Sequence, residues 1–207
     1  EGAAHRRRDP LHGGGAGGTA ASLPGGRYYF PLPVGGWGWA GEDFYIGALN
    51  VHPFPIPHDA ADPVGFAFDC QGLRCGVATD IGHISETWMR AVSGCQALVL
   101  EANHDVDMVR RGPYPQRLKQ RILGQKGHLN NEDCARALCE LAESGTRAVF
   151  LSHLSTDNNL PELAYNTVCG ALSAAGFDVG NDIRVCVSRR DRVSDLLTLQ
   201  TDEADAM

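Results

Sequence analysis

Three short apolar runs constrain the fold of this chain more than any other feature. They are "ALVLEAN" (97–103), "RAVFLSH" (147–153) and "DIRVCVS" (182–188), and each ends in polar residues. Runs of this length and composition indicate strands of a sheet that is covered on both faces. Segments with helical spacing precede and separate them, at 85–94, 130–145 and 160–176. Strands that alternate with helices predict an α/β or α+β protein.

The ends of the helical segments carry recognisable signals. Ser85 is a candidate N-cap for the first helix, and Asn130 with Asp133 three residues later resembles a capping box for the second. In the third, Pro161 lies in the first turn and Gly176 lies at the expected stop.

The first half of the chain indicates a β-meander. Strands are expected at 27–34, 42–56, 65–69 and 74–80, where aromatic and β-branched residues lie between glycines and prolines. The Gln71-Gly72 pair separates the last two strands and is well suited to a tight hairpin turn.

Length and composition favour a single domain. The chain has 207 residues, of which 43% are hydrophobic, and this is enough to bury one sizeable core. Residues 1–26 are rich in Gly, Ala and Arg, so we expect a flexible lead-in there and one domain over 27–207. The first residue is not methionine, and the chain is expected to start partway through a larger unit.

Net charge argues against a protein that coats nucleic acid. Eighteen Lys and Arg residues against 25 Asp and Glu give a formal charge of −7. A phosphate-bearing substrate therefore needs a local site, such as a bound metal or the short basic run at 110–126. That run either contacts a polynucleotide backbone or forms a solvated helix face. Its cations are Arg110, Arg111, Arg117, Lys119, Arg121 and Lys126.

Cysteine usage and hydropathy predict a cytoplasmic protein. The seven cysteines include no C-x-x-C pair, and their odd number leaves at least one unpaired within the chain, which favours reduced thiols. No signal-peptide pattern and no apolar run of membrane-spanning length occur in the sequence. We expect no membrane partner, and a homo-oligomer is possible.

Four apolar runs deliver a histidine or an aspartate at the carboxyl end. These residues are His58, Asp80, His104 and His153. Strand ends on one side of an α/β sheet share a rim, so these side chains can meet there and supply the ligands that Zn²⁺ takes. Taken singly, three of them have a structural alternative: loop histidines at 58 and 153, and for Asp80 a cap for the next helix. We interpret His52 and His83 as surface residues.

Five segments, taken together and in order, resemble a known family. They are "PHDAADPVGF", "VATDIGH", "LEANHD", "GQKGHLNNEDCA" and "LSHLSTDNN". From about residue 45 to 190 the chain is similar to the metallo-β-lactamase superfamily, and within it to the YycJ-like branch of nucleases and phosphodiesterases. The resemblance implies an αββα sandwich with two divalent metal ions at one edge of the sheets, zinc first and manganese as the alternative.

The resemblance also implies roles for individual residues. His58 and His153 match terminal ligands of the two ions, and Asp80 matches the carboxylate that bridges them. His128 matches a histidine that assists the leaving group at the scissile phosphate, which makes His128 and Asp80 the implied catalytic residues. The implied substrate-binding residues are Asn103, His104 and Asn130.

One signature of the superfamily, H-x-H-x-D-H, does not occur in these 207 residues. In the family it supplies four ligands and precedes the segments matched here. The chain is therefore expected to be an N-terminally incomplete representative of the fold, with weak or absent metal binding and little hydrolysis on its own.

The expected function is that of a metal-dependent hydrolase. The reading that the resemblance favours is a nuclease or phosphodiesterase acting on nucleic acid or another phosphodiester through a metal-activated water. Two alternatives stay open: a non-catalytic remnant or interaction module of the same fold, and a lactone or thioester hydrolase with the same metals.

Overall fold

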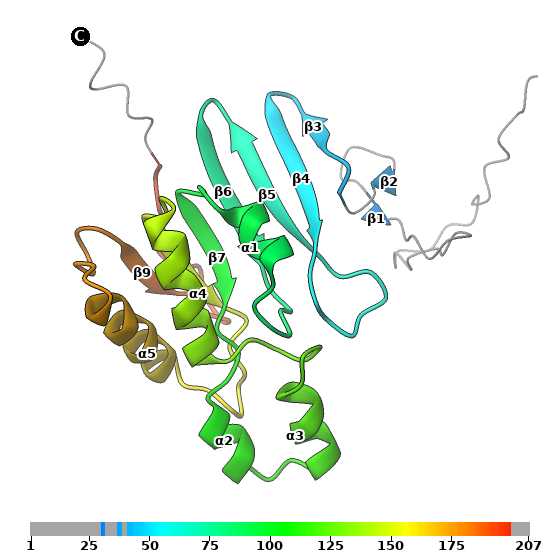
Figure 1. Cartoon of the computed structure of the whole chain (residues 1–207), viewed down its shortest axis with the longest axis vertical. Helices are drawn as coiled ribbons and strands as arrows, with labels where there is room; N and C mark the ends of the chain where they lie inside the picture. The colour runs from blue at the N-terminus through cyan, green and yellow to red at the C-terminus, as the bar shows by residue number, and fades with distance from the viewer. Residues whose placement is uncertain (1–29, 32–36, 39–40, 200–207) are drawn as a thin grey trace, which may run out of the picture.

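The protein is built on one seven-stranded mixed sheet (Figure 1). The computed structural model describes residues 30–31, 37–38 and 41–199. The sheet has the order β3-β4-β5-β6-β7-β8-β9. Pairing is antiparallel from β3 to β6 and parallel from β6 to β9. The strands are β3 (Phe44–Ile46), β4 (Leu49–Pro55), β5 (Val64–Cys70), β6 (Leu73–Ala78), β7 (Ala97–Glu101), β8 (Ala148–Ser152) and β9 (Arg184–Val187).

Two further strands, β1 (Phe30–Pro31) and β2 (Trp37–Gly38), form a separate antiparallel pair. The predicted lead-in at 1–26 and most of the strand predicted at 27–34 lie outside the described residues. The mixed sheet with its helices confirms the predicted α/β fold class.

Helices connect the parallel strands and cover the sheet. In Figure 1, α1 and α4 lie in front of the sheet, α5 flanks α4, and α2 and α3 extend below the lower edge. Helix α4 packs on α5, and α5 packs on β9. The helices are α1 (Glu86–Val92), α2 (Val106–Arg111), α3 (Gln116–Ile122), α4 (Asn131–Glu143) and α5 (Pro161–Ala174).

The core lies between the sheet and these helices. Leu98 pairs with Val149 and Leu100 with Leu151 in the β7–β8 ladder, so all four side chains lie on one face of the sheet. All four are at most 1% exposed, as are Trp88 of α1 and Leu138 of α4. The apolar runs predicted as strands thus form a buried layer in β7 and β8.

Local signals in the sequence placed the turn and two helix starts correctly. Gln71 (φ 50°) and Gly72 (φ 79°) form the hairpin turn between β5 and β6, where two positive φ angles match the right-handed twist of the strands. Asn130 caps α4, because its Oδ1 accepts from the Asp133 N–H at 2.8 Å. Pro161 begins α5 as predicted.

Other expectations require correction. Ser85 is the N-cap residue of α1, but its side chain makes no capping hydrogen bond. The predicted strand 42–56 is a hairpin of β3 and β4, because Gly47 (φ 62°) turns the chain between them. Helices α2 and α3 were not predicted. Among the described residues, no helix is both long enough and apolar enough to cross a membrane.

Candidate metal centre at the carboxyl edge of the sheet

The polar residues predicted at strand ends gather at one edge of the sheet. Strands β6, β7 and β8 are parallel, so their carboxyl ends lie side by side. Asp80 follows β6 by two residues, Glu101 is the last residue of β7, and His153 follows β8 directly. Loops add His58, after β4, and His128, before α4.

Asp80 lies at the centre of a group of three imidazoles. Its Oδ1 is 3.8 Å from His58 Nε2, 3.9 Å from His128 Nδ1 and 3.8 Å from His153 Nδ1. The ring centroids of His58 and His128 are 5.1 Å apart, and those of His128 and His153 are 5.3 Å apart. The four side chains therefore face a common point.

Glu101 is a fully buried carboxylate that anchors this group from below. Its Oε1 accepts from His128 Nδ1 at 3.0 Å and from His153 Nδ1 at 2.6 Å. Its Oε2 accepts from the backbone N–H groups of Ile81 at 2.6 Å and Leu129 at 3.1 Å. An ionised carboxylate only accepts hydrogen bonds, so both imidazoles carry a hydrogen on Nδ1 and leave Nε2 available.

The ionisation of Glu101 follows from the same contacts. Burial alone would raise the pKa of Glu101, but the hydrogen bonds from His128, His153 and the Leu129 N–H bring that pKa down to about 2. The pKa of His153 is raised, chiefly because its ring donates to Glu101. These contacts therefore favour the ionised form of Glu101 and the protonated form of His153.

Two residues of the group have an unusual backbone. Asp80 has φ 61° and His153 has φ 57°, in the left-handed region that non-glycine residues seldom adopt. In each case this conformation occurs just after a strand end, where it turns the side chain toward the group. Strain of this kind is typical of functional sites.

The donor set fits a divalent metal ion. The candidate ligand atoms of Asp80, Glu101, His128 and His153 all lie within 4.8 Å of one another. His58 Nε2 points at the same place: its side chain is only 10% exposed, and this nitrogen has no hydrogen-bond partner among the described residues. A buried imidazole nitrogen without a partner, beside a carboxylate, suits a cation.

Buried asparagines tie together the loops that carry the group. Asn131 and Asn159 exchange two side-chain hydrogen bonds, at 3.0 and 2.9 Å, and Asn159 also donates to the Ala102 carbonyl at 2.9 Å. Asn103 Nδ2 donates to the His153 carbonyl at 2.7 Å. These hydrogen bonds therefore connect the segments after β7, before α4 and after β8. The three segments lie next to Glu101, His128 and His153, respectively.

The structure brings the predicted metal ligands His58, Asp80 and His153 together with His128, which was predicted to be catalytic. The three residues predicted to bind substrate instead make contacts within the fold. Asn103 holds the loop of His153, Asn130 caps α4, and His104 is 1% exposed. Burial lowers the pKa of His104 to about 4. A substrate-binding role for these three residues stays a prediction.

Glu101 is the site residue that was missed from sequence. The signal was present, since Glu101 is the one charged residue within the apolar run of β7. A carboxylate at a fully buried strand position needs partners, and here the two histidines and two backbone N–H groups supply them.

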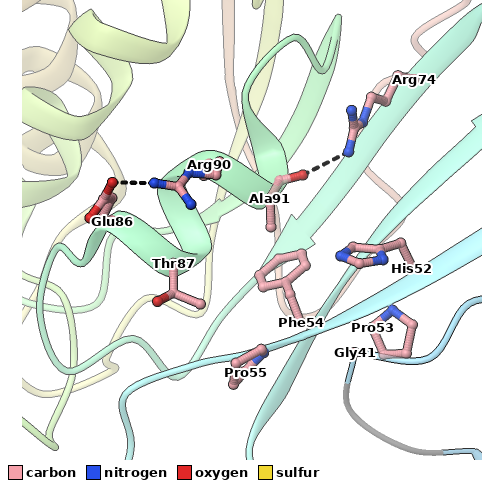
Figure 2. Close-up of a pocket in the computed structure, with 10 residues that line it drawn as sticks. All are labelled: Gly41, His52, Pro53, Phe54, Pro55, Arg74, Glu86, Thr87, Arg90 and Ala91. Atoms are coloured by element: carbon pink, nitrogen blue, oxygen red, sulfur yellow. Dashed lines mark hydrogen bonds and ion pairs between the residues drawn. The ribbon is translucent and has the colours of Figure 1, made fainter.

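Residues away from this edge have local partners. His83 Nδ1 lies 2.8 Å from the Gln125 carbonyl, and His52 Nδ1 lies 2.5 Å from Asp43 Oδ1. His52 also lines a cavity of about 370 Å³ between β4 and α1, which contains no residue of the predicted site (Figure 2). Beside that cavity Glu86 pairs with Arg90, and Arg74 Nη2 donates to the Ala91 carbonyl at 2.9 Å.

The basic run at 110–126 occupies α2, α3 and the loop after them. Three of its six cations are engaged within the protein. Arg111 pairs with Asp107 at 3.1 Å and Arg121 with Asp59 at 2.5 Å, while Lys119 donates to the Arg110 carbonyl at 2.7 Å. This arrangement favours the solvated helix face over a dedicated phosphate-binding surface.

Comparison with known families decides the membership of the chain. Residues 31–154, more than half of the sequence, match the model described as the beta-lactamase superfamily domain. The chain belongs to the beta-lactamase superfamily. This confirms the family resemblance read from the sequence, and the residues matched include all of His58, Asp80, His128 and His153.

Curated relatives point to one branch of the superfamily. The chain is 40% identical over 140 residues to the exodeoxyribonuclease YycJ of Bacillus anthracis, covering 68% of this chain and 53% of the relative. It is 36% identical over 156 residues to the exodeoxyribonuclease WalJ of Streptococcus pneumoniae serotype 2, covering 75% and 58%. The chain thus spans between half and three fifths of the length of these relatives.

A solved structure agrees with the fold. The metallo-beta-lactamase fold protein YhfI from Bacillus subtilis superposes with a TM-score of 0.52 at 12% identity, over 72% of this chain and 51% of that chain. At this identity the likeness shows the fold alone. The superfamily fold implies divalent metal ions, and the group around Asp80 is the place where the described residues can hold them.

Proposed function

We propose that the chain carries part of the active site of a metal-dependent phosphodiesterase, most specifically a nuclease. The observation that carries this proposal is the convergence of three imidazoles on Asp80, above the buried Glu101. The names of the two curated relatives support nucleic acid as the substrate class.

In this proposal His58, Asp80 and His153 hold the divalent ions. A carboxylate offers two oxygens and so suits a bridging position, whereas each imidazole nitrogen binds one ion. Zinc is the expected metal and manganese the alternative. When bound, the ions supply a water of lowered pKa and positive charge beside the phosphate.

His128 acts on the leaving group. Its Nδ1 donates to Glu101, so its Nε2 is the atom positioned to exchange a proton with the departing oxygen. Glu101 fixes the tautomer and the orientation of that ring, and it does the same for His153. A carboxylate behind a functional histidine is the arrangement that orients imidazoles in many metal sites.

We further propose that the chain on its own binds ions weakly and hydrolyses slowly, within a single domain over 27–207. The pattern H-x-H-x-D-H, which the family resemblance implies for four further ligands, does not occur in these residues. With His58, Asp80 and His153 alone, neither of two ions has a closed ligand set.

Hydrolysis at high metal concentration tests the proposal. The purified chain is incubated with millimolar Mn²⁺ or Zn²⁺ and a labelled single-stranded DNA, which offsets weak binding by mass action. We expect slow cleavage that EDTA abolishes, that Asp80→Asn removes and that His128→Gln reduces. His52→Gln is the matched control, because His52 lies in the cavity of Figure 2 and should leave the rate unchanged.

The other outcomes select among the alternatives. DNA binding without cleavage at saturating metal would favour an interaction module. Cleavage of a thioester or lactone but not of DNA would favour the third reading. Light scattering of the same sample shows whether the chain forms a homo-oligomer.

A further inference from the structure

A large groove opens beside His153. It measures about 1270 Å³, which exceeds the range of about 300 to 1,000 Å³ typical of small-molecule pockets. Three segments line it: the loop 153–156, the first turns of α5, and β9 with the chain that follows it to 195. A groove of this size suits a stretch of polymer that leads into the site.

One wall of the groove carries three exposed arginines within four residues, Arg189, Arg190 and Arg192. Arg190 Nη2 donates to the Leu154 carbonyl at 3.0 Å, so its guanidinium lies one residue from His153. Phosphate groups are the ligands for which closely spaced guanidinium groups are suited. Arg190 is therefore held by a contact within the protein, beside the candidate centre.

Helix α5 contributes an aromatic side chain to the lining of the groove. Tyr165 of α5 is 39% exposed and lines the groove, as does Leu160, which is 53% exposed. An exposed aromatic ring and closely spaced arginines in one groove are the combination that binds single-stranded nucleic acid, through stacking and backbone contacts.

The groove is not uniformly basic. The acidic residues Glu162, Asp191 and Asp195 also line it. Asp195 Oδ2 lies 3.8 Å from Arg184 Nη2. Equal numbers of arginine and acidic side chains argue against a surface for any polyanion. This mixture of charges fits a ligand whose phosphates contact individual arginines while one of its bases stacks on Tyr165.

We propose that this groove binds the single-stranded polynucleotide that the candidate centre cleaves, with Arg189 and Arg192 on its phosphates and Tyr165 on a base. The inference rests on the proposed function for its substrate class. It differs from the sequence-based expectation, which placed backbone contacts on the basic run 110–126.

Binding measured without catalysis tests the groove separately from the reaction. Fluorescence anisotropy follows a short fluorescein-labelled oligodeoxythymidylate added to the full 207-residue chain in EDTA, from about 50 to 200 mM salt. We expect the Arg189→Gln/Arg192→Gln double variant to bind about tenfold more weakly. Its plot of log affinity against log salt should lose about 1.4 in slope, since each single-strand phosphate contact contributes about 0.7.

The matched control removes the same charge elsewhere. Arg117→Gln/Lys126→Gln neutralises two exposed cations of the basic run, and it should weaken binding less than about twofold. Tyr165→Leu should weaken binding about tenfold with the salt slope unchanged, because stacking is not ionic. Asp191→Asn should tighten binding about twofold, a gain that misfolding cannot mimic.

The results separate the two proposals. Equal losses in both double variants, no loss in the groove variant, no binding by the unmodified chain, or equal competition by polyglutamate would each overturn the groove. Groove-dependent binding without any metal-dependent cleavage would leave the groove standing and overturn the proposed function. Metal-dependent cleavage that is unchanged in all groove variants would support the proposed function and overturn the groove as the binding site.

Discussion

Polar side chains have different surroundings in the parallel half of the sheet, from β6 to β9, and in the antiparallel half, from β3 to β6. In the parallel half, Asp80, Glu101 and His153 all lie at the carboxyl ends of neighbouring strands and meet at one edge. In the antiparallel half, His52 lies within β4 and pairs with nearby Asp43. That half contributes to the edge only through His58, because β4 runs in the same direction as β6.

The difference teaches where this fold gathers chemistry. Parallel strands bring residues that are far apart in sequence to one place, whereas neighbouring antiparallel strands send theirs to opposite edges. A polar side chain within a strand must find a local partner, and one at the shared edge can act together with others.

The largest effect is expected at Glu101. Glu101→Gln replaces a buried acceptor of four hydrogen bonds with an amide, and it should lower the free energy of unfolding by about 3 to 5 kcal/mol. Urea unfolding measures the loss. The matched control is Glu140→Gln on the exposed face of α4, expected to change stability by less than about 0.5 kcal/mol. Similar losses in both variants would contradict the anchoring role.

Acid should destabilise the protein because His104 is buried. Its pKa in the folded protein is lowered to about 4, chiefly by burial, from an ordinary value of 6.5. Between these values the unfolded chain binds more protons, so stability should fall as the pH drops from about 6.5 to about 4, by about 2 to 3 kcal/mol. Unfolding at several pH values should show a shallower dependence in His104→Leu. If the stability of His104→Leu depended on pH as strongly as that of the unmodified chain, His104 would not be the cause of the loss.

The asparagine pair should matter less than the buried charge but more than a surface contact. Asn159→Ala leaves Asn131 and the Ala102 carbonyl without their partner, and we expect a loss of about 2 kcal/mol in unfolding free energy. Asn166→Ala, exposed on α5, should be neutral or slightly stabilising, because alanine favours helices. Thermal unfolding of the two variants side by side gives the comparison.

The smallest effect is expected in the antiparallel half. His52→Gln breaks an ion pair whose side chains are 34% and 42% exposed, so the stability change should stay below about 1 kcal/mol. A large loss of stability, or any change in metal binding, would contradict the difference between the two halves of the sheet. Chemical unfolding and a metal titration of the same sample check both points.

Much of the parallel half could be predicted from sequence because its signals are local. The apolar runs of β7 and β8, the Asn130 cap and the Gln71-Gly72 turn each depend on residues close together in the chain. The polar residue after each run then indicated which side chains share an edge.

What could not be predicted depends on contacts between distant segments. The role of Glu101 arises from His128 and His153, which are 27 and 52 residues away. Helices α2 and α3 have only six and seven residues, too few for periodicity to stand out. The groove beside His153 requires α5 and the chain after β9 to lie beside the same cavity, which no local pattern encodes.

Metal titration of the purified chain tests the central claim most directly. Competition with a chromophoric chelator should show weak Zn²⁺ binding that Asp80→Asn and His153→Gln abolish and that His52→Gln leaves unchanged. Binding that survives Asp80→Asn would contradict the placement of the metal centre at this edge. Tight, near-stoichiometric zinc in the unmodified chain would contradict the proposal that its ligand set is incomplete.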